Sequence, residues 1–256
     1  MGEQKFFFSR SKAARIKTKA DIVPCIDVTG SMKPCIEGVK NSLNQFVEGL
    51  QTAAEVDFRI RPIFFKDLHD PTYKGSPWTI GSFSSDINDF KRELASAVAD
   101  GGGNNADGES GLDALYMAIH SDWRPDAHRT IIFMTDEDSH PTLHHTTYQR
   151  PDNGVDRVIQ DFQTLRHAML FMVCPNYPIY HKIEKSMCEA DRKIVASYVP
   201  TEGDRHIGLR NVNFGPLFKM IGQQVSLTSV AMARAGKGCE HGMASSENFS
   251  SRQACR

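Results

Sequence analysis

Oxygen-bearing side chains follow two apolar runs of the sequence. The first run is followed by Asp27, Thr29 and Ser31 at alternate positions, and the second run, near residue 130, is followed by Asp136. Hard cations such as Mg²⁺ prefer carboxylates combined with neutral oxygens and water. An aspartate, two hydroxyls and further acids meet that preference, and the set needs no cysteine or histidine. These residues therefore predict a site for Mg²⁺, with Mn²⁺ or Ca²⁺ as alternatives, rather than for zinc or copper.

A glycine-rich loop between these two motifs supplies further acids. The loop begins with three consecutive glycines, runs directly into a helix and carries Asp107 and Glu109. We expect one of these two carboxylates to contribute to the cation site, and the residue types leave open which one. Asp138 and His140 come shortly after the second motif. They are candidates for a further ligand or for the rim of the site.

Short apolar strands alternate with amphipathic helices along the chain. Strands are expected at 22–26, 56–65, 80–83, 130–134, 168–174 and 194–199, and helices at 34–50, 87–98, 112–119, 155–165, around 183 and at 217–225. This alternation is typical of an α/β fold with a doubly wound, mostly parallel six-stranded sheet and helices on both faces. In such sheets, ligands bind beyond the carboxyl ends of the strands. Asp27 and Asp136 are expected at that edge.

Taken together, the motifs resemble the von Willebrand factor A (vWA) domain with its metal-ion-dependent adhesion site. The family signature, D-x-[ST]-x-S after the first strand, matches Asp27 to Ser31, and a later aspartate at a strand end matches Asp136. Segments similar to the A-type domains associated with alpha-kinases and to related bacterial proteins lie at 101–115, 65–67 and 122–125. The resemblance covers roughly residues 20–230 and implies the family's Rossmann-like fold.

The resemblance also implies a ligand set. Its members are Asp27, Thr29, Ser31, Glu109 and Asp136. The two hydroxyls would bind the metal directly, and the aspartates directly or through water. Glu109 matches the glutamate that integrin-type members use, and Asp107 is its competitor.

In this family the metal keeps an open coordination position that is filled by a carboxylate of a partner protein. The contact is charge-assisted and demanding in its geometry. The resemblance therefore implies a non-enzymatic, metal-dependent interaction module that binds an Asp or Glu side chain of a protein partner. It also suggests that the partner is a kinase or an ATPase of the same system.

Two other functions stay open. The first is a scaffold of the same fold that binds partners without metal, through its basic arm or its tail. The second is a Mg²⁺-dependent phosphohydrolase of the haloacid dehalogenase type. Those enzymes need D-x-D, and Thr29 stands where the second acid would be. A threonine hydroxyl cannot serve as the general acid or base near neutral pH. Neither a G-K-[ST] after the glycine loop nor a G-x-S-x-G elbow is present.

Three histidines follow the second acidic motif: His140, His144 and His145. Their spacing raises the possibility of a second metal site, but Pro141 argues against one continuous helical face. We expect them to line the rim of the binding face. Protonation near pH 6 to 7 would there tune the attraction for an acidic partner.

Composition excludes several kinds of partner. The chain has 256 residues, with 30 Lys and Arg against 31 Asp and Glu, for a formal net charge of −1. A dedicated nucleic-acid binder would carry a basic excess. No run approaches the roughly 18 apolar residues of a membrane span, and the first residues lack the apolar core of a signal peptide. We expect a cytoplasmic protein that binds neither nucleic acid nor membrane.

Changes in composition along the chain indicate three parts. Residues 1–19 form a basic N-terminal arm, and residues 20–232 form the vWA-like domain. Residues 233–256, rich in Gly, Ser, Asn and charge, are expected to be a disordered tail.

Overall fold

The computed structural model describes residues 17–52, 55–103, 108–149, 153–186, 188–189, 192–199, 209 and 211–243. Most of the basic arm, the end of the tail and Asp107 lie outside the described residues. The predictions for these parts therefore stay predictions.

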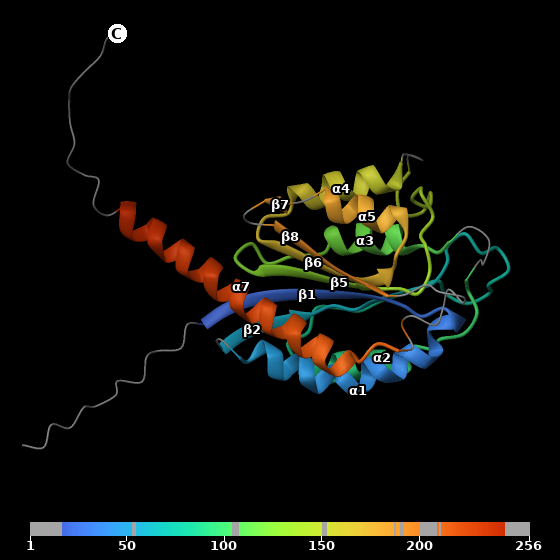
Figure 1. Ribbon diagram of the computed structural model, residues 1–256, viewed down its shortest axis with the longest axis horizontal. Helices are drawn as coiled ribbons and strands as arrows, with labels where there is room; N and C mark the ends of the chain where they lie inside the picture. The colour runs from blue at the N-terminus through green and yellow to red at the C-terminus, as the bar shows by residue number, and fades with distance from the viewer. Residues whose placement is uncertain are drawn as a thin grey trace, which may run out of the picture.

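Strands of the described chain form one sheet in the order β4-β3-β1-β5-β6-β8-β7, with β2 also paired to β1. Their bounds are β1 (Lys17–Asp27), β2 (Glu55–Ile60), β3 (Ile63–Phe65), β4 (Trp78–Ile80), β5 (His128–Met134), β6 (Ala168–Pro175), β7 (Cys188–Glu189) and β8 (Arg192–Val199). Every pairing is parallel except those of the short edge strands β4 and β7. The predicted mostly parallel α/β sheet is confirmed (Figure 1). The described residues form eight strands rather than the predicted six, because the strand predicted at 56–65 is divided and the short strand β7 was not predicted.

One predicted strand, 56–65, is divided into β2 and β3. The register pairs Ile22 with Ile60 and Cys25 with Ile63, so its continuation places Pro62 beside Pro24. Neither proline has a backbone N–H to donate to the neighbouring strand. The pairing is therefore interrupted between β2 and β3, although β1 itself runs through Pro24 without a break.

Helices cover both faces of the sheet (Figure 1). They are α1 (Lys33–Leu50), α2 (Ile87–Ser96), α3 (Gly111–Ile119), α4 (Gly154–Thr164), α5 (Pro178–Lys185) and α7 (Phe214–Met243). Buried side chains of α1, α2 and α7 pack with one face of the strands, and those of α3, α4 and α5 pack with the other. The chain is thus doubly wound, with an apolar core on each side of the sheet.

Two glycines allow α7 to lie directly on α1. A Cβ on Gly49 would come within 2.3 Å of the backbone oxygen of Lys219, and a Cβ on Gly222 within 2.4 Å of that of Phe46. Only residues without a side chain permit this approach of the two backbones. The helix continues to Met243 and so passes residue 232, where the sequence predicts the domain to end.

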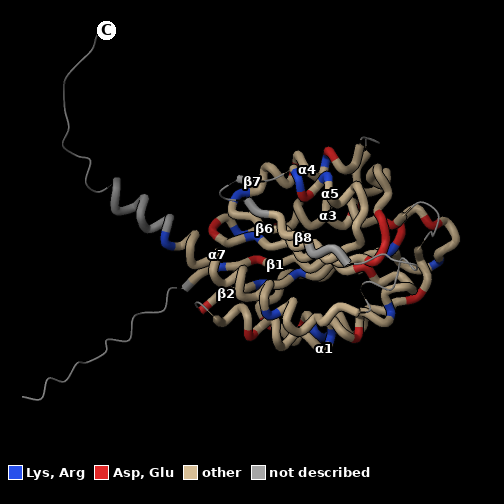
Figure 2. The backbone as a smooth tube through the Cα atoms, in the orientation of Figure 1, with Lys and Arg blue, Asp and Glu red and all other residues tan. Residues whose placement is uncertain are grey.

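The sheet brings acidic residues to one end of the molecule. The central strands β1 and β5 run in parallel, and their last paired residues are Ile26 and Met134. Asp and Glu gather at this carboxyl end, on the right in Figure 2. Among the described helices, none combines the length and apolar character that crossing a membrane requires.

Candidate functional site

Asp27 ends β1 in a fully buried position and accepts three hydrogen bonds. Its Oδ1 accepts from the backbone N–H of Thr29 at 2.8 Å and from the Thr29 hydroxyl at 2.7 Å. Its Oδ2 accepts from the hydroxyl of Thr135, which follows β5, at 2.8 Å. The carboxylate is therefore held rigidly between the ends of the two central strands.

A chain of oxygens continues from Asp27 to the second motif. The hydroxyls of Thr29 and Ser31 lie 3.1 Å apart, and Ser31 donates to Asp136 Oδ1 at 3.0 Å. The short 3₁₀ helix η1 (Gly30–Met32) turns the chain from β1 into α1 and places Ser31 on this path. The structure thus brings together the four residues of the two predicted motifs.

Glu109 reaches the same place from the glycine-rich loop. Its backbone N–H donates to the backbone carbonyl oxygen of Asp138 at 2.9 Å. Its backbone carbonyl oxygen accepts from the backbone N–H of His140, also at 2.9 Å. Gly108 has φ +99°, and a Cβ there would lie 3.0 Å from the oxygen of Asp138. A glycine is needed at this position, because it allows the two loops to pair closely.

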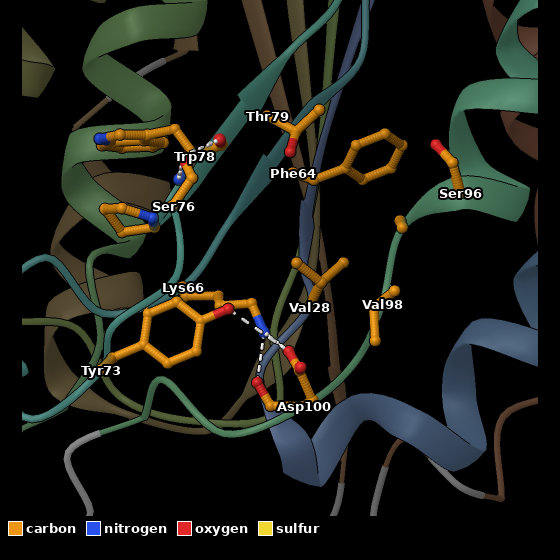
Figure 3. A pocket seen from close by; sticks show the side chains of 12 residues that line it. Val28, Phe64, Lys66, Tyr73, Ser76, Trp78, Thr79, Ser96, Val98 and Asp100 are labelled. Atoms are coloured by element: carbon orange, nitrogen blue, oxygen red, sulfur yellow. Dashed lines mark hydrogen bonds and ion pairs between the residues drawn. The ribbon is translucent and has the colours of Figure 1, made fainter.

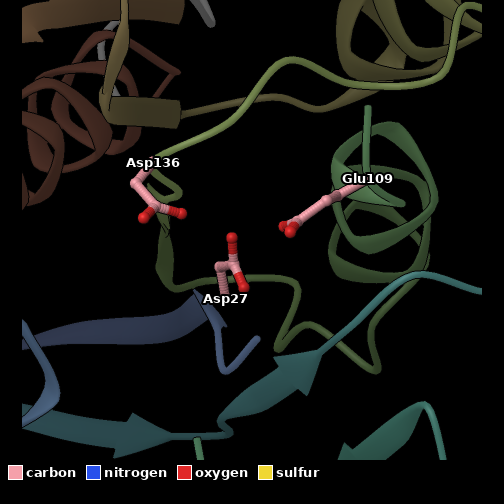
Figure 4. Close-up of side chains that lie close together, drawn as sticks. All are labelled: Asp27, Glu109 and Asp136. Atoms are coloured by element: carbon pink, nitrogen blue, oxygen red, sulfur yellow. The ribbon is translucent and has the colours of Figure 1, made fainter. Parts of the chain in front are cut away.

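Asp27, Glu109 and Asp136 point toward one another (Figure 4). We call these three carboxylates the acidic triad. Each offers a ligand oxygen, and the three oxygens lie within 4.8 Å of one another. All three residues are buried, with at most 5% of their surface exposed. Like charges so close together in a buried place repel strongly unless a proton or a cation compensates them.

The repulsion affects the protonation of Glu109. Its burial, together with the negative charges of Asp27 and Asp136, raises the pKa of its carboxyl well above the usual range. Its Oε2 is buried and has no hydrogen-bond partner among the described residues. A buried carboxylate oxygen without a hydrogen bond is costly in free energy, and a bound cation would compensate that cost.

The donor set fits a hard divalent cation. It combines three carboxylates with the hydroxyls of Thr29 and Ser31, and the triad contains no sulfur or imidazole. Such all-oxygen sets are those that Mg²⁺, Mn²⁺ and Ca²⁺ prefer. Asp107, the competing ligand from the loop, lies outside the described residues.

Asp138 and His140 lie outside the acidic triad. The carboxylate of Asp138 accepts from the N–H of Ser139 at 2.8 Å, and His140 Nε2 lies 2.9 Å from Asp67 Oδ1. The ring of His140 also packs against His69, with the ring centroids 4.1 Å apart. His140 thus belongs to a neighbouring group of side chains, beside the triad rather than in it.

The histidines of that group are His69, His140, His144 and His145. Burial, reinforced by the neighbouring imidazoles, lowers the pKa of His69, and the same causes lower that of His144. Proton binding by these two rings is therefore shifted toward lower pH. The effect of the histidines on a partner stays a prediction.

Three residues that position the site were not identified from the sequence. Thr135 donates to Asp27, and Ser139 donates to the backbone oxygen of Glu109 at 3.1 Å. A Cβ on Gly103 would lie 2.8 Å from Glu109 Oε1, so this glycine leaves room for the triad. Their proximity to motif residues in the sequence was the available signal, but their contacts depend on the packing of separate loops.

The fold has counterparts among known proteins, although no protein-family model matches the chain. A solved structure of von Willebrand factor type A from Catenulispora acidiphila superimposes with a TM-score of 0.50, at 14% identity, over 82% of this chain and 43% of that one. The chain has the von Willebrand factor A fold. The pilus adhesin SpaC from Lactobacillus rhamnosus GG also matches the vWA fold of this chain, with a TM-score of 0.50 and 11% identity, over 83% of this chain and 31% of the adhesin.

A sequence relative adds one further similarity. The alpha-protein kinase vwkA from Dictyostelium discoideum is 29% identical over 137 residues. The match includes 53% of this chain and 21% of the kinase, so this vWA-fold chain spans only a fraction of that relative's length.

Proposed function

We propose that this vWA-fold protein is a metal-dependent protein-interaction module. The observation that carries the proposal is the acidic triad, whose three carboxylate oxygens lie within 4.8 Å of one another at the carboxyl end of the sheet. Asp27, Glu109 and Asp136, with the hydroxyls of Thr29 and Ser31, would hold one Mg²⁺, or Mn²⁺ or Ca²⁺ in its place. The fold supports the more general role of an interaction module.

The partner is proposed to be a protein that offers an Asp or Glu side chain to the metal. A carboxylate is a hard oxygen ligand and carries the charge that complements a divalent cation. Its contact is strengthened where the surrounding protein excludes water. Similarity to part of an alpha-kinase supports the suggestion that the partner is a kinase, or an ATPase of the same system.

We propose a binding role rather than a catalytic one for the site. The position where a phosphohydrolase of this general architecture places a second acid holds Thr29, and the Thr29 hydroxyl donates to Asp27. A hydroxyl so engaged is a poor general acid or base near neutral pH. We also propose that the protein acts in the cytoplasm and binds neither nucleic acid nor membrane.

A pull-down from native lysate tests the function. Wild-type bait is compared in Mg²⁺ and in EDTA with Asp27→Asn, which keeps the shape of the side chain but removes one carboxylate. We expect a partner that is retained by wild type in Mg²⁺ and lost both on chelation and with the variant. A partner retained equally in all conditions would instead favour a metal-independent scaffold.

A further inference from the structure

A cavity of about 300 Å³ lies beside Val28, which follows β1, between the edge of the sheet and the end of α2. Phe64, Val28 and Val98 provide apolar walls, and Thr79 and Ser96 provide hydroxyls (Figure 3). This volume is at the lower end of the range for sites that bind small molecules. The cavity is separate from the acidic triad, none of whose members lines it.

A buried cation lies at one side of the cavity. The side chain of Lys66 is only 5% exposed, and its ammonium lies over the ring of Tyr73, 4.8 Å from the centroid. It donates to Asp100 Oδ1 at 2.5 Å and also to the backbone oxygen of Asp100. Among the described residues, the hydrogen bonds of this ammonium thus go to two oxygens of one residue, Asp100.

The two members of the Lys66–Asp100 pair differ sharply in exposure. The side chain of Asp100 is 62% exposed, whereas that of Lys66 is 5% exposed. Asp100 can exchange Lys66 for water at little cost, because its carboxylate is already largely hydrated. Lys66 cannot do so, because a buried ammonium without an anion is strongly disfavoured. The counter-ion of Lys66 is therefore replaceable, provided that another anion takes its place.

We propose that this cavity binds a small organic carboxylate with an apolar body, whose carboxylate replaces that of Asp100 on Lys66. The apolar body would contact Phe64, Val28 and Val98 and the face of Tyr73. The Lys66 ammonium lowers the pKa of Asp100, in keeping with a carboxylate bound in its charged form. The proposal is independent of the acidic triad and needs no metal.

Benzoate is a suitable probe, because it combines a carboxylate with a small apolar ring. We would titrate the full chain with benzoate in EDTA and follow the methyl NMR signals of Val28 and Val98. Asp100→Asn removes the internal competitor and should tighten benzoate binding about tenfold. Lys66→Met removes the cation at similar length and should weaken benzoate binding about tenfold or more.

Two controls assign the effect to this cavity. Benzamide, which has the same ring without the charge, should bind more weakly and should not respond to Asp100→Asn. Asp156→Asn, which removes an exposed carboxylate of α4 that does not line the cavity, should leave benzoate binding unchanged. Equal benzoate affinity in wild type and Asp100→Asn, or the absence of any response of the Val28 and Val98 methyls in both proteins, would overturn the proposal. The Asp100→Asn comparison decides even if Lys66→Met fails to fold.

Discussion

Ser31 Oγ donates a hydrogen bond to Asp136 Oδ1 over 3.0 Å and so joins two motifs that are 105 residues apart in the chain. The contact depends on the parallel pairing of β1 and β5, which ends at Ile26 and Met134. Both motifs begin directly after these residues. The pairing of β1 and β5 therefore brings Asp27 and Ser31 close to Asp136. Glu109 joins them from the glycine-rich loop before α3.

Glu109→Gln should weaken Mg²⁺ binding about tenfold or more, because it removes one of three charged ligand candidates. The same change should stabilise the metal-free protein by roughly 1 kcal/mol, since it relieves repulsion within the acidic triad. Calorimetric Mg²⁺ titration and urea unfolding in EDTA measure the two effects. Asp107→Asn is the matched comparison. If it weakens Mg²⁺ binding and Glu109→Gln does not, Asp107 is the ligand from the loop.

Gly103→Ala should weaken Mg²⁺ binding, because the new Cβ would lie 2.8 Å from Glu109 Oε1 and displace that side chain. We expect a loss of about tenfold in affinity. Gly215→Ala is the control, since a Cβ at that helical position meets nothing closer than 3.6 Å. An unchanged Mg²⁺ titration of Gly103→Ala would show that Glu109 does not need its present position.

Asp113 should make stability depend on pH. Its side chain is fully buried on α3, and burial raises the pKa of its carboxyl from 3.8 to about 6. The folded protein therefore holds this proton more tightly than the unfolded chain, so its contribution to stability is lost as pH rises from about 4 to 6. Asparagine does not ionise, so Asp113→Asn removes this pH-dependent loss of stability.

Relative to wild type, the free energy of unfolding of Asp113→Asn should rise by about 3 kcal/mol between pH 3.5 and pH 7. Urea unfolding of both proteins in EDTA at the two pH values gives this difference, and groups that titrate in both proteins cancel. A difference independent of pH would mean that Asp113 is not buried as described.

Gly222→Ala should destabilise the fold by roughly 2 to 3 kcal/mol. The added Cβ would come within 2.4 Å of the backbone oxygen of Phe46, so α7 must move away from α1. Thermal and urea unfolding measure the loss, and Gly215→Ala, on the same helix, should be nearly neutral. Equal stability of the two variants would be incompatible with the close crossing of α1 and α7.

The strands could be predicted from the sequence because apolar runs mark buried parallel strands. The meeting of Asp27 with Asp136 follows from the same pattern, since parallel strands end at a common edge. The division of the strand at 56–65 could not be predicted. It depends on Pro62 lying beside Pro24, which only the register of the sheet determines.

The surroundings of His140 illustrate a second limit. The sequence places it near the acidic motif, but in the structure it pairs with Asp67 and packs against His69. Those residues precede it by some seventy positions and lie on a separate loop. Side-chain contacts between loops depend on tertiary packing, which hydrophobic periodicity does not describe.

Calorimetric titration of wild type and Asp27→Asn with Mg²⁺ is the most direct measurement of the proposed metal site. Asp27 is the buried carboxylate on which Thr29 and Thr135 converge, and asparagine preserves its shape while removing its charge. We predict one Mg²⁺ site per wild-type chain and its loss in a variant that remains folded by circular dichroism. Equal Mg²⁺ binding by the two folded proteins would contradict the assignment of the acidic triad as a metal site.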